Sequence, residues 1–168
     1  MTTNLECGPR GNTMCLSKAG LAIGDGSKLG VAIVSTVGSG VDYVIDGVIR
    51  NLADAATDKP LTAAAQQAAA SKCLYLIQVN AAGTVSSVKG TAELTTDLNA
   101  GVEVLHWPQP AADNCPIGAV LMITTTTAFT AGTTALDGTG CTAAYYNLST
   151  VPSGPMTFTS AGVASPVI

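Results

Sequence analysis

The sequence predicts a mainly β protein, a small antiparallel β-sandwich or barrel with an extended N-terminal arm. From residue 41 onward, short runs of β-branched residues alternate with glycine, proline and Asp-Gly turn signals, which is typical of such folds. Aromatic residues are only 4% of the 168 residues, so we expect aliphatic side chains to build the core. Residues 1–40 are punctuated by glycine without a sustained period. Two parts are therefore predicted, an arm (1–40) and a β domain (41–168).

The clearest local signal is a hairpin at residues 41–52, VDYVIDGVIRNL. Its two short apolar strands flank Asp46 and Gly47, a pair that suits a type I′ turn. Residues 29–37 are also rich in β-branched side chains, although they fall within the predicted arm. Further strands are predicted for residues 73–79, 84–88, 117–129 and 141–151.

Two segments allow more than one interpretation. Residues 57–72 are rich in alanine and glutamine, which favours either a short helix or a loose crossover. Residues 92–105 fit one helical turn or a further strand. Between the strands, residues 106–116 hold three prolines and predict a loop, and residues 154–168 predict a polar, proline-flanked tail.

Charge is scarce and unevenly placed. Charged residues are 11% of the chain, against roughly 25% in average globular domains. All seven lysines and arginines precede Gly90, where six acids give that part a net charge of +1, and five acids without a base give the rest −5, which sum to −4. The missing basic stripe argues against nucleic-acid binding. A surface so poor in charge is explained if partner subunits cover much of it, because interface cores are depleted in charge.

Membrane insertion and secretion are not expected. A spanning helix needs about 20 mostly apolar residues, and no run in the chain reaches that length. The first residues carry Glu6, Pro9 and Gly11, where the apolar part of a secretory signal should lie. We therefore predict no membrane partner.

Catalytic and cofactor signatures are missing from the sequence. His106 is the single histidine, and we interpret it as a structural or surface residue. Residues 24–30 loosely match a dinucleotide fingerprint, but a β-branched run follows where a helix is required, so a glycine turn is the better interpretation. We predict no catalytic residue, no metal, no cofactor and no enzymatic activity.

The chain has five cysteines, an odd number, and no two of them have CxxC spacing. We interpret them as small buried apolar residues in a reducing compartment, with one or two disulfides as the alternative. They are Cys7, Cys15, Cys73, Cys115 and Cys141.

Three segments together suggest a family. They are YVIDGVIRNLA (43–53), CLYLIQVNAAGTVSSVKG (73–90) and CPIGAVLMITTTTAFTAGTTALDGTG (115–140). Residues 41–140 thereby resemble the decoration proteins, also called cement or head-fibre-like proteins, of tailed bacteriophages. The resemblance implies a homodimer or homotrimer on the outer surface of the virion, made in the host cytoplasm, that bridges major capsid protein subunits.

Within this interpretation, we expect the N-terminal arm to bind the capsid. Arg10, Lys18 and Lys28 should lie nearest the shell, and deleting residues 1–30 should leave a folded β domain without capsid binding. The alternative function is a receptor- or glycan-binding fibre module. Its contacts would be exposed aromatic side chains at Trp107, Tyr145 and Tyr146.

Overall fold

The computed structural model describes residues 13–35 and 38–149. That part of the chain is mainly β with one short helix, which confirms the predicted fold class. The elements are β1 (Met14–Cys15), β2 (Leu21–Ile23), β3 (Gly30–Ile33), β4 (Val41–Ile45), β5 (Val48–Leu52), β6 (Ala55–Pro60), β7 (Ser71–Asn80), β8 (Val85–Lys89), β9 (Glu93–Leu94), α1 (Thr95–Asn99), β10 (Asn114–Thr124) and β11 (Cys141–Asn147).

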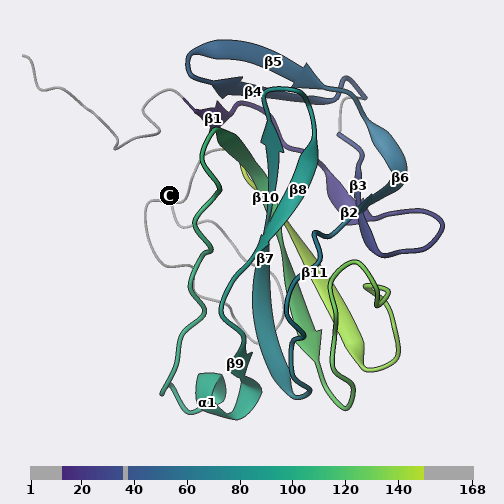
Figure 1. Cartoon of the computed structure of the whole chain (residues 1–168), viewed down its shortest axis with the longest axis vertical. Helices are drawn as coiled ribbons and strands as arrows, with labels where there is room; N and C mark the ends of the chain where they lie inside the picture. Colours follow the sequence, from purple (N-terminus) through teal and green to yellow (C-terminus); the bar gives the residue numbers. More distant parts are fainter. Residues whose placement is uncertain (1–12, 36–37, 150–168) are drawn as a thin grey trace, which may run out of the picture.

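The strands form three antiparallel sheets. The main sheet has the order β11-β10-β7-β8, and β9 pairs with the first two residues of β7. The two smaller sheets have the orders β1-β4-β5 and β2-β3-β6. In Figure 1 the long strands of the main sheet run through the body, and β4 and β5 cross one end of them.

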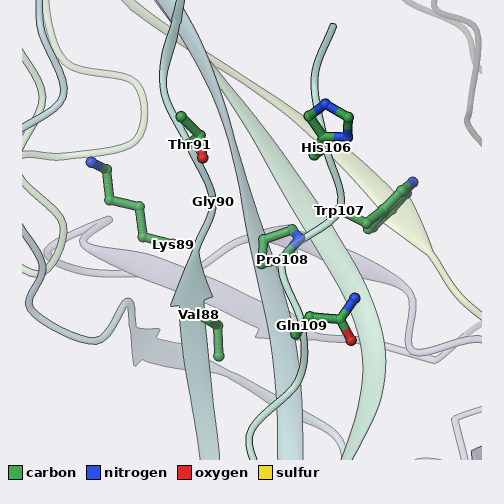
Figure 2. A pocket seen from close by; sticks show the side chains of 8 residues that line it. All are labelled: Val88, Lys89, Gly90, Thr91, His106, Trp107, Pro108 and Gln109. Carbon is green, nitrogen blue, oxygen red and sulfur yellow. The ribbon is translucent and has the colours of Figure 1, made fainter.

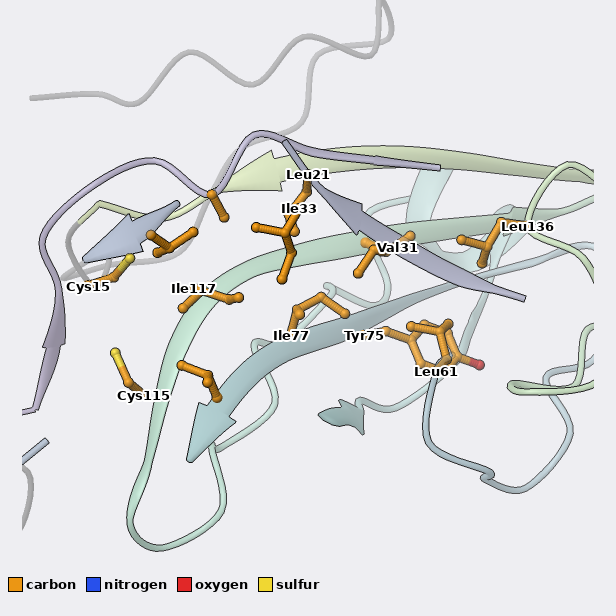
Figure 3. Packing of buried hydrophobic residues seen from close by; sticks show 14 of the residues in the cluster. Cys15, Leu21, Val31, Ile33, Leu61, Tyr75, Ile77, Cys115, Ile117 and Leu136 are labelled. Carbon is orange, nitrogen blue, oxygen red and sulfur yellow. The ribbon is translucent and has the colours of Figure 1, made fainter. Parts of the chain in front are cut away.

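One core joins the three sheets into a sandwich. Figure 3 shows part of the buried cluster, in which Leu21 of β2 and Val31 of β3 pack with Tyr75 and Ile77 of β7 and Ile117 of β10. Apolar burial of this kind stabilises a fold by about 25 cal/mol per Å² removed from water. Aliphatic side chains dominate the cluster, as the low aromatic content predicts.

Strands β7 and β10 are buried along nearly their whole length. Their register pairs Val120 with Tyr75 and Leu121 with Leu74, and these two pairs belong to different apolar clusters on opposite faces. Both faces of the main sheet are therefore apolar at its centre, which explains the continuous apolar runs in the sequence.

The predicted hairpin and its turn are confirmed. Strands β4 and β5 pair from Val41–Leu52 to Ile45–Val48, which leaves Asp46 and Gly47 as the loop. Their φ angles are 52° and 78°, both positive as a type I′ turn requires.

The predicted arm is wrong for residues 13–35. Strand β1 pairs with β4 and strand β3 with β6, and the side chains of Cys15, Leu21 and Ile33 are part of the core. These strands have two to four residues, too short to show a period in the sequence. The boundary at residue 40 therefore does not divide the fold, and deleting residues 1–30 would remove core side chains. Residues 1–12, like the tail at 154–168, lie outside the described residues.

The alanine-rich segment before β7 is a crossover without a helix. Gln67 is fully buried there, and its backbone exchanges hydrogen bonds of 2.8 and 3.0 Å with Phe129. Its side-chain amide donates to the carbonyls of Ser71 and Met122, and Tyr75 Oη donates to its Oε1. These bonds to distant residues outweigh the helix propensity of alanine. Both alternatives for residues 92–105 are present, since the two-residue strand β9 is followed directly by the single helical turn of α1.

The run of four threonines ends β10 earlier than predicted. Thr124 is the last residue of the strand, and its buried hydroxyl bonds the carbonyls of Ala68 and Ser71. Residues 125–127 are exposed and leave the strand. The connection at 130–140 then leads into β11 as expected.

We predict that Leu21→Ala lowers the free energy of unfolding by about 2–5 kcal/mol, because it opens a cavity in the core. Leu21 is 6% exposed, whereas Leu16, five residues earlier, is 46% exposed. Leu16→Ala is therefore the control and should change stability by only about 0.5 kcal/mol. Urea unfolding followed by circular dichroism measures both; equal effects would contradict the placement of residues 13–35 in the body.

Candidate functional site

The described residues hold no cluster suited to metal binding. No three His, Cys, Asp or Glu side chains gather within residues 13–35 and 38–149. His106 is exposed on a loop. No helix among the described residues is long and apolar enough to cross a membrane. Two surfaces of the sandwich are the candidates for function.

The cysteine side chains of the described part are free thiols, as the buried-residue interpretation predicts. Burial raises the pKa of Cys15 and Cys73 to about 11 and that of Cys115 to about 12. Cys141 is half-buried, and burial raises its pKa as well. At neutral pH these thiols stay protonated, and a protonated thiol is a poor nucleophile.

The first candidate surface is the face of the main sheet opposite the core, which we call the Trp107 face. Leu74, Ala119 and Leu121 form its buried centre. Half-buried apolar side chains from the preceding loop, β10 and β11 surround that centre. They are Leu105, Trp107, Ile123, Ala144 and Tyr146.

Loop 100–113 carries Trp107 onto this face. The loop is anchored at its start by Val102, whose N–H donates to the carbonyl of Asp97 at 2.9 Å, and near its end by Ala111, whose N–H donates to Gln78 Oε1 at 2.9 Å. Gly90 lets the loop approach the sheet, because a Cβ there would lie 3.0 Å from Leu74 O and 3.1 Å from Pro108 Cγ.

A groove of about 420 Å³ lies beside this loop, between it and the end of β8. In Figure 2, Pro108 lies between the two segments, whereas the ring of Trp107 points away from the end of β8. Polar side chains line the groove, so it offers hydrogen-bonding groups to a ligand. They are Lys89, Thr91, His106 and Gln109.

The second candidate surface is the outward side of the β1-β4-β5 sheet, which we call the hairpin face. Met14 lies opposite Val44, and Val44 lies opposite Ile49, so the three side chains form one cross-strand row. Met14 and Ile49 are 43% and 71% exposed. Leu16 follows on the same side, and Val48 at the start of β5 is also exposed. The row combines exposed apolar side chains with open sheet edges at β1 and β5.

The three basic residues predicted at an interface have different surroundings. Lys18 is exposed. Lys28 Nζ lies 2.6 Å from Asp137 Oδ2, and this hydrogen-bonded ion pair raises the pKa of the lysine. The pair, together with the 2.8 Å bond from Leu136 N to Lys28 O, ties the β2–β3 loop to the connection before β11. Arg10 lies outside the described residues.

Tyr145 and Tyr146 are not exposed loop residues, which corrects that prediction. Both are half-buried in β11, where the period of two turns their side chains to opposite faces. Tyr145 packs against the main core, and Tyr146 packs on the Trp107 face. Of the three predicted aromatic contacts, the structure places Trp107 and Tyr146 on the same face.

The hairpin face was missed by the sequence reasoning. Its signal lay in the confirmed hairpin, since a two-residue loop at Asp46 and Gly47 places Val44 opposite Ile49. Met14 joins them only through the pairing of β1 with β4, which no local pattern predicts. No protein-family model, curated protein or solved structure matches this chain.

We predict that the folded state loses stability as pH rises above about 9. The buried thiols of Cys15, Cys73 and Cys115 hold their protons up to about pH 11–12, whereas the unfolded chain releases them near 9. Their contribution to stability is complete below pH 9 and is lost progressively between there and about 12. Urea midpoints at pH 8 and pH 10 measure it. The triple variant C15A/C73A/C115A should show a smaller fall, and an unchanged fall would contradict thiol titration as its cause.

Proposed function

We propose that this chain is a structural virion protein that decorates the outer surface of a phage capsid and stabilises it by bridging major capsid protein subunits. It would act without catalysis, as a homodimer or homotrimer, after synthesis in the host cytoplasm. The observation that carries the proposal is the hairpin face, an exposed apolar surface on a charge-poor sandwich. The motif resemblance at residues 43–53, 73–90 and 115–140 agrees with it.

The hairpin face has the character of an interface rather than of a solvated surface. Burying an exposed isoleucine, leucine or methionine side chain contributes about 1.5–3 kcal/mol. The charges nearby are engaged within the chain: Asn51 Nδ2 donates to Asp42 Oδ1 at 2.9 Å, and Arg50 donates to the carbonyl of Ala81 at 2.8 Å. A partner that covers Met14 and Ile49 therefore gains apolar burial, while Asp42 and Arg50 keep hydrogen-bond partners within the chain.

The edges of the same sheet support contact with another protein. Strand β5 pairs only with β4, and its Val48 and Ile49 are exposed although they point to opposite sides. An unguarded edge of this kind is a template for a partner strand. A capsid offers many equivalent positions, so modest contacts at each oligomer subunit add up to durable attachment through avidity.

The basic residues contribute unequally to this proposal. Lys18 is exposed and follows the exposed Leu16 by two residues, so it stays in the proposed capsid interface. Lys28 is occupied by Asp137 and would have to give up that ion pair to reach a partner. We therefore place the interface at the hairpin face with Lys18 at its rim.

A second candidate function is favoured by the groove beside Trp107. A groove of about 420 Å³ lined by lysine, threonine, histidine and glutamine side chains suits a sugar, which binds through hydrogen bonds. This supports a receptor- or glycan-binding fibre module. A glycan array tests it, and His106→Ala should abolish any sugar-dependent signal.

We predict that Ile49→Lys weakens binding to empty shells of the phage that encodes the chain by at least about tenfold, equivalent to 1.4 kcal/mol. The variant places a charge where apolar contact is required. Val102→Lys is the matched control, because Val102 is also 71% exposed but lies on the loop after α1. Occupancy of decorated shells, measured by sedimentation and quantitative gels, gives the affinities.

Two results would contradict this proposal. If Ile49→Lys occupied shells as fully as the unaltered chain, the hairpin face would not be the interface. If mass spectrometry of purified virions detected no copy of the chain, the structural role itself would be wrong. Circular dichroism confirms that both lysine variants fold.

A further inference from the structure

We infer that the Trp107 face is a docking surface for an uncharged, extended peptide, and that its occupant is the chain's own segment 150–168. This inference is independent of the proposed capsid role. That role rests on the hairpin face, whereas the inference concerns the Trp107 face of the main sheet. It rests on the apolar character of the face, on where β11 ends, on the composition of the segment and on a buried donor without an acceptor.

The face is too apolar to suit solvent exposure. Its buried centre is flanked by half-buried aromatic rings of Trp107 and Tyr146 and by Ile123. Tryptophan and tyrosine are the side chains that contribute most to binding surfaces, because they bury a large apolar area with few rotatable bonds.

The segment starts at the rim of this face. Tyr146 pairs with Ala119, and the N–H of Leu148 still donates to the carbonyl of Ile117 at 3.1 Å, so the chain leaves the sheet beside Tyr146. Adjacent strands lie about 4.8 Å apart and an extended residue advances about 3.3 Å, so about four residues reach from β11 across β10. A tethered segment so close has a high effective concentration at the face.

The composition of the segment matches the face. Residues 150–168 contain no charged side chain. Met156 and Phe158 are two apart in the sequence MTFT, so they point to the same side of an extended chain. Thioether and phenyl groups both pack favourably on aromatic rings. The other exposed apolar surface, the hairpin face, lies on a different sheet.

Trp107 gives a second, independent indication. Its indole N–H is buried and has no hydrogen-bond acceptor. Leaving a buried donor unpaired costs about 1–3 kcal/mol. An extended peptide has a row of backbone carbonyls that accept hydrogen bonds. After a small movement of the Trp107 ring, its indole N–H would donate to one of them.

The experiment uses the full chain and its single tryptophan. In the variant M156S/F158S we expect Trp107 emission, excited selectively, to shift to longer wavelengths and to be quenched more strongly by acrylamide, because the ring loses its cover. The matched control T157S/T159S alters the other side of the same stretch and should leave the emission unchanged. Emission identical in the two variants would overturn the inference.

Photo-crosslinking locates the occupant directly. With benzoylphenylalanine in place of Phe158, we expect an intrachain crosslink to residues 105–107 or to β11, identified by mass spectrometry. A crosslink between chains, with emission that depends on concentration, would show that a second copy fills the face and would overturn the inference. Crosslinks confined to the hairpin face would also overturn it.

Discussion

The pairing of β7 with β10 is the constraint on which the rest of the structure depends. Both strands are buried along nearly their whole length, so the sheet they form needs apolar cover on both faces. The two small sheets cover one face, and side chains of loop 100–113 lie on the other. Gln67 fixes the approach to β7 by bonding the backbone of both long strands. Every candidate surface is a consequence of how this central pair is covered.

The two candidate surfaces differ in origin. The hairpin face exists because the β1-β4-β5 sheet turns one side to the core, with Tyr43 and Ile45, and has nothing over its other side among the described residues. The Trp107 face exists because one loop covers a sheet only in part. The thiols of Cys15 and Cys115 belong to the core and are protonated. Both surfaces suit binding by contact area.

The sequence predicted those parts of the fold that local chemistry determines. Asp46 and Gly47 gave the turn, and the apolar run at 73–79 gave a central strand. Segments whose structure depends on distant partners were not predictable. Strand β1 is two residues long and exists only through its pairing with β4, and the alanines around Gln67 do not form a helix because that side chain bonds the core.

The candidate site was predictable to a similar extent. Trp107 stood out as the single tryptophan, but the sequence did not reveal that Tyr146 packs on the same face while Tyr145 packs against the core. Lys28 appeared available because its partner Asp137 is far away in the sequence. To predict the row from Met14 to Ile49, the register of three strands would have to be known, and β1 is distant in the chain from β4 and β5.

Hydrogen–deuterium exchange of the chain, free and bound to phage shells, tests the central claim that it functions by sharing surface. The amides of β5 face an open edge in the free chain and should exchange quickly there. On shells, the account predicts slowed exchange confined to β1, β5 and the residues around Lys18, with β7 and β10 unchanged because they are already protected. Identical exchange in the two states, or protection confined to the groove beside Trp107, would contradict it.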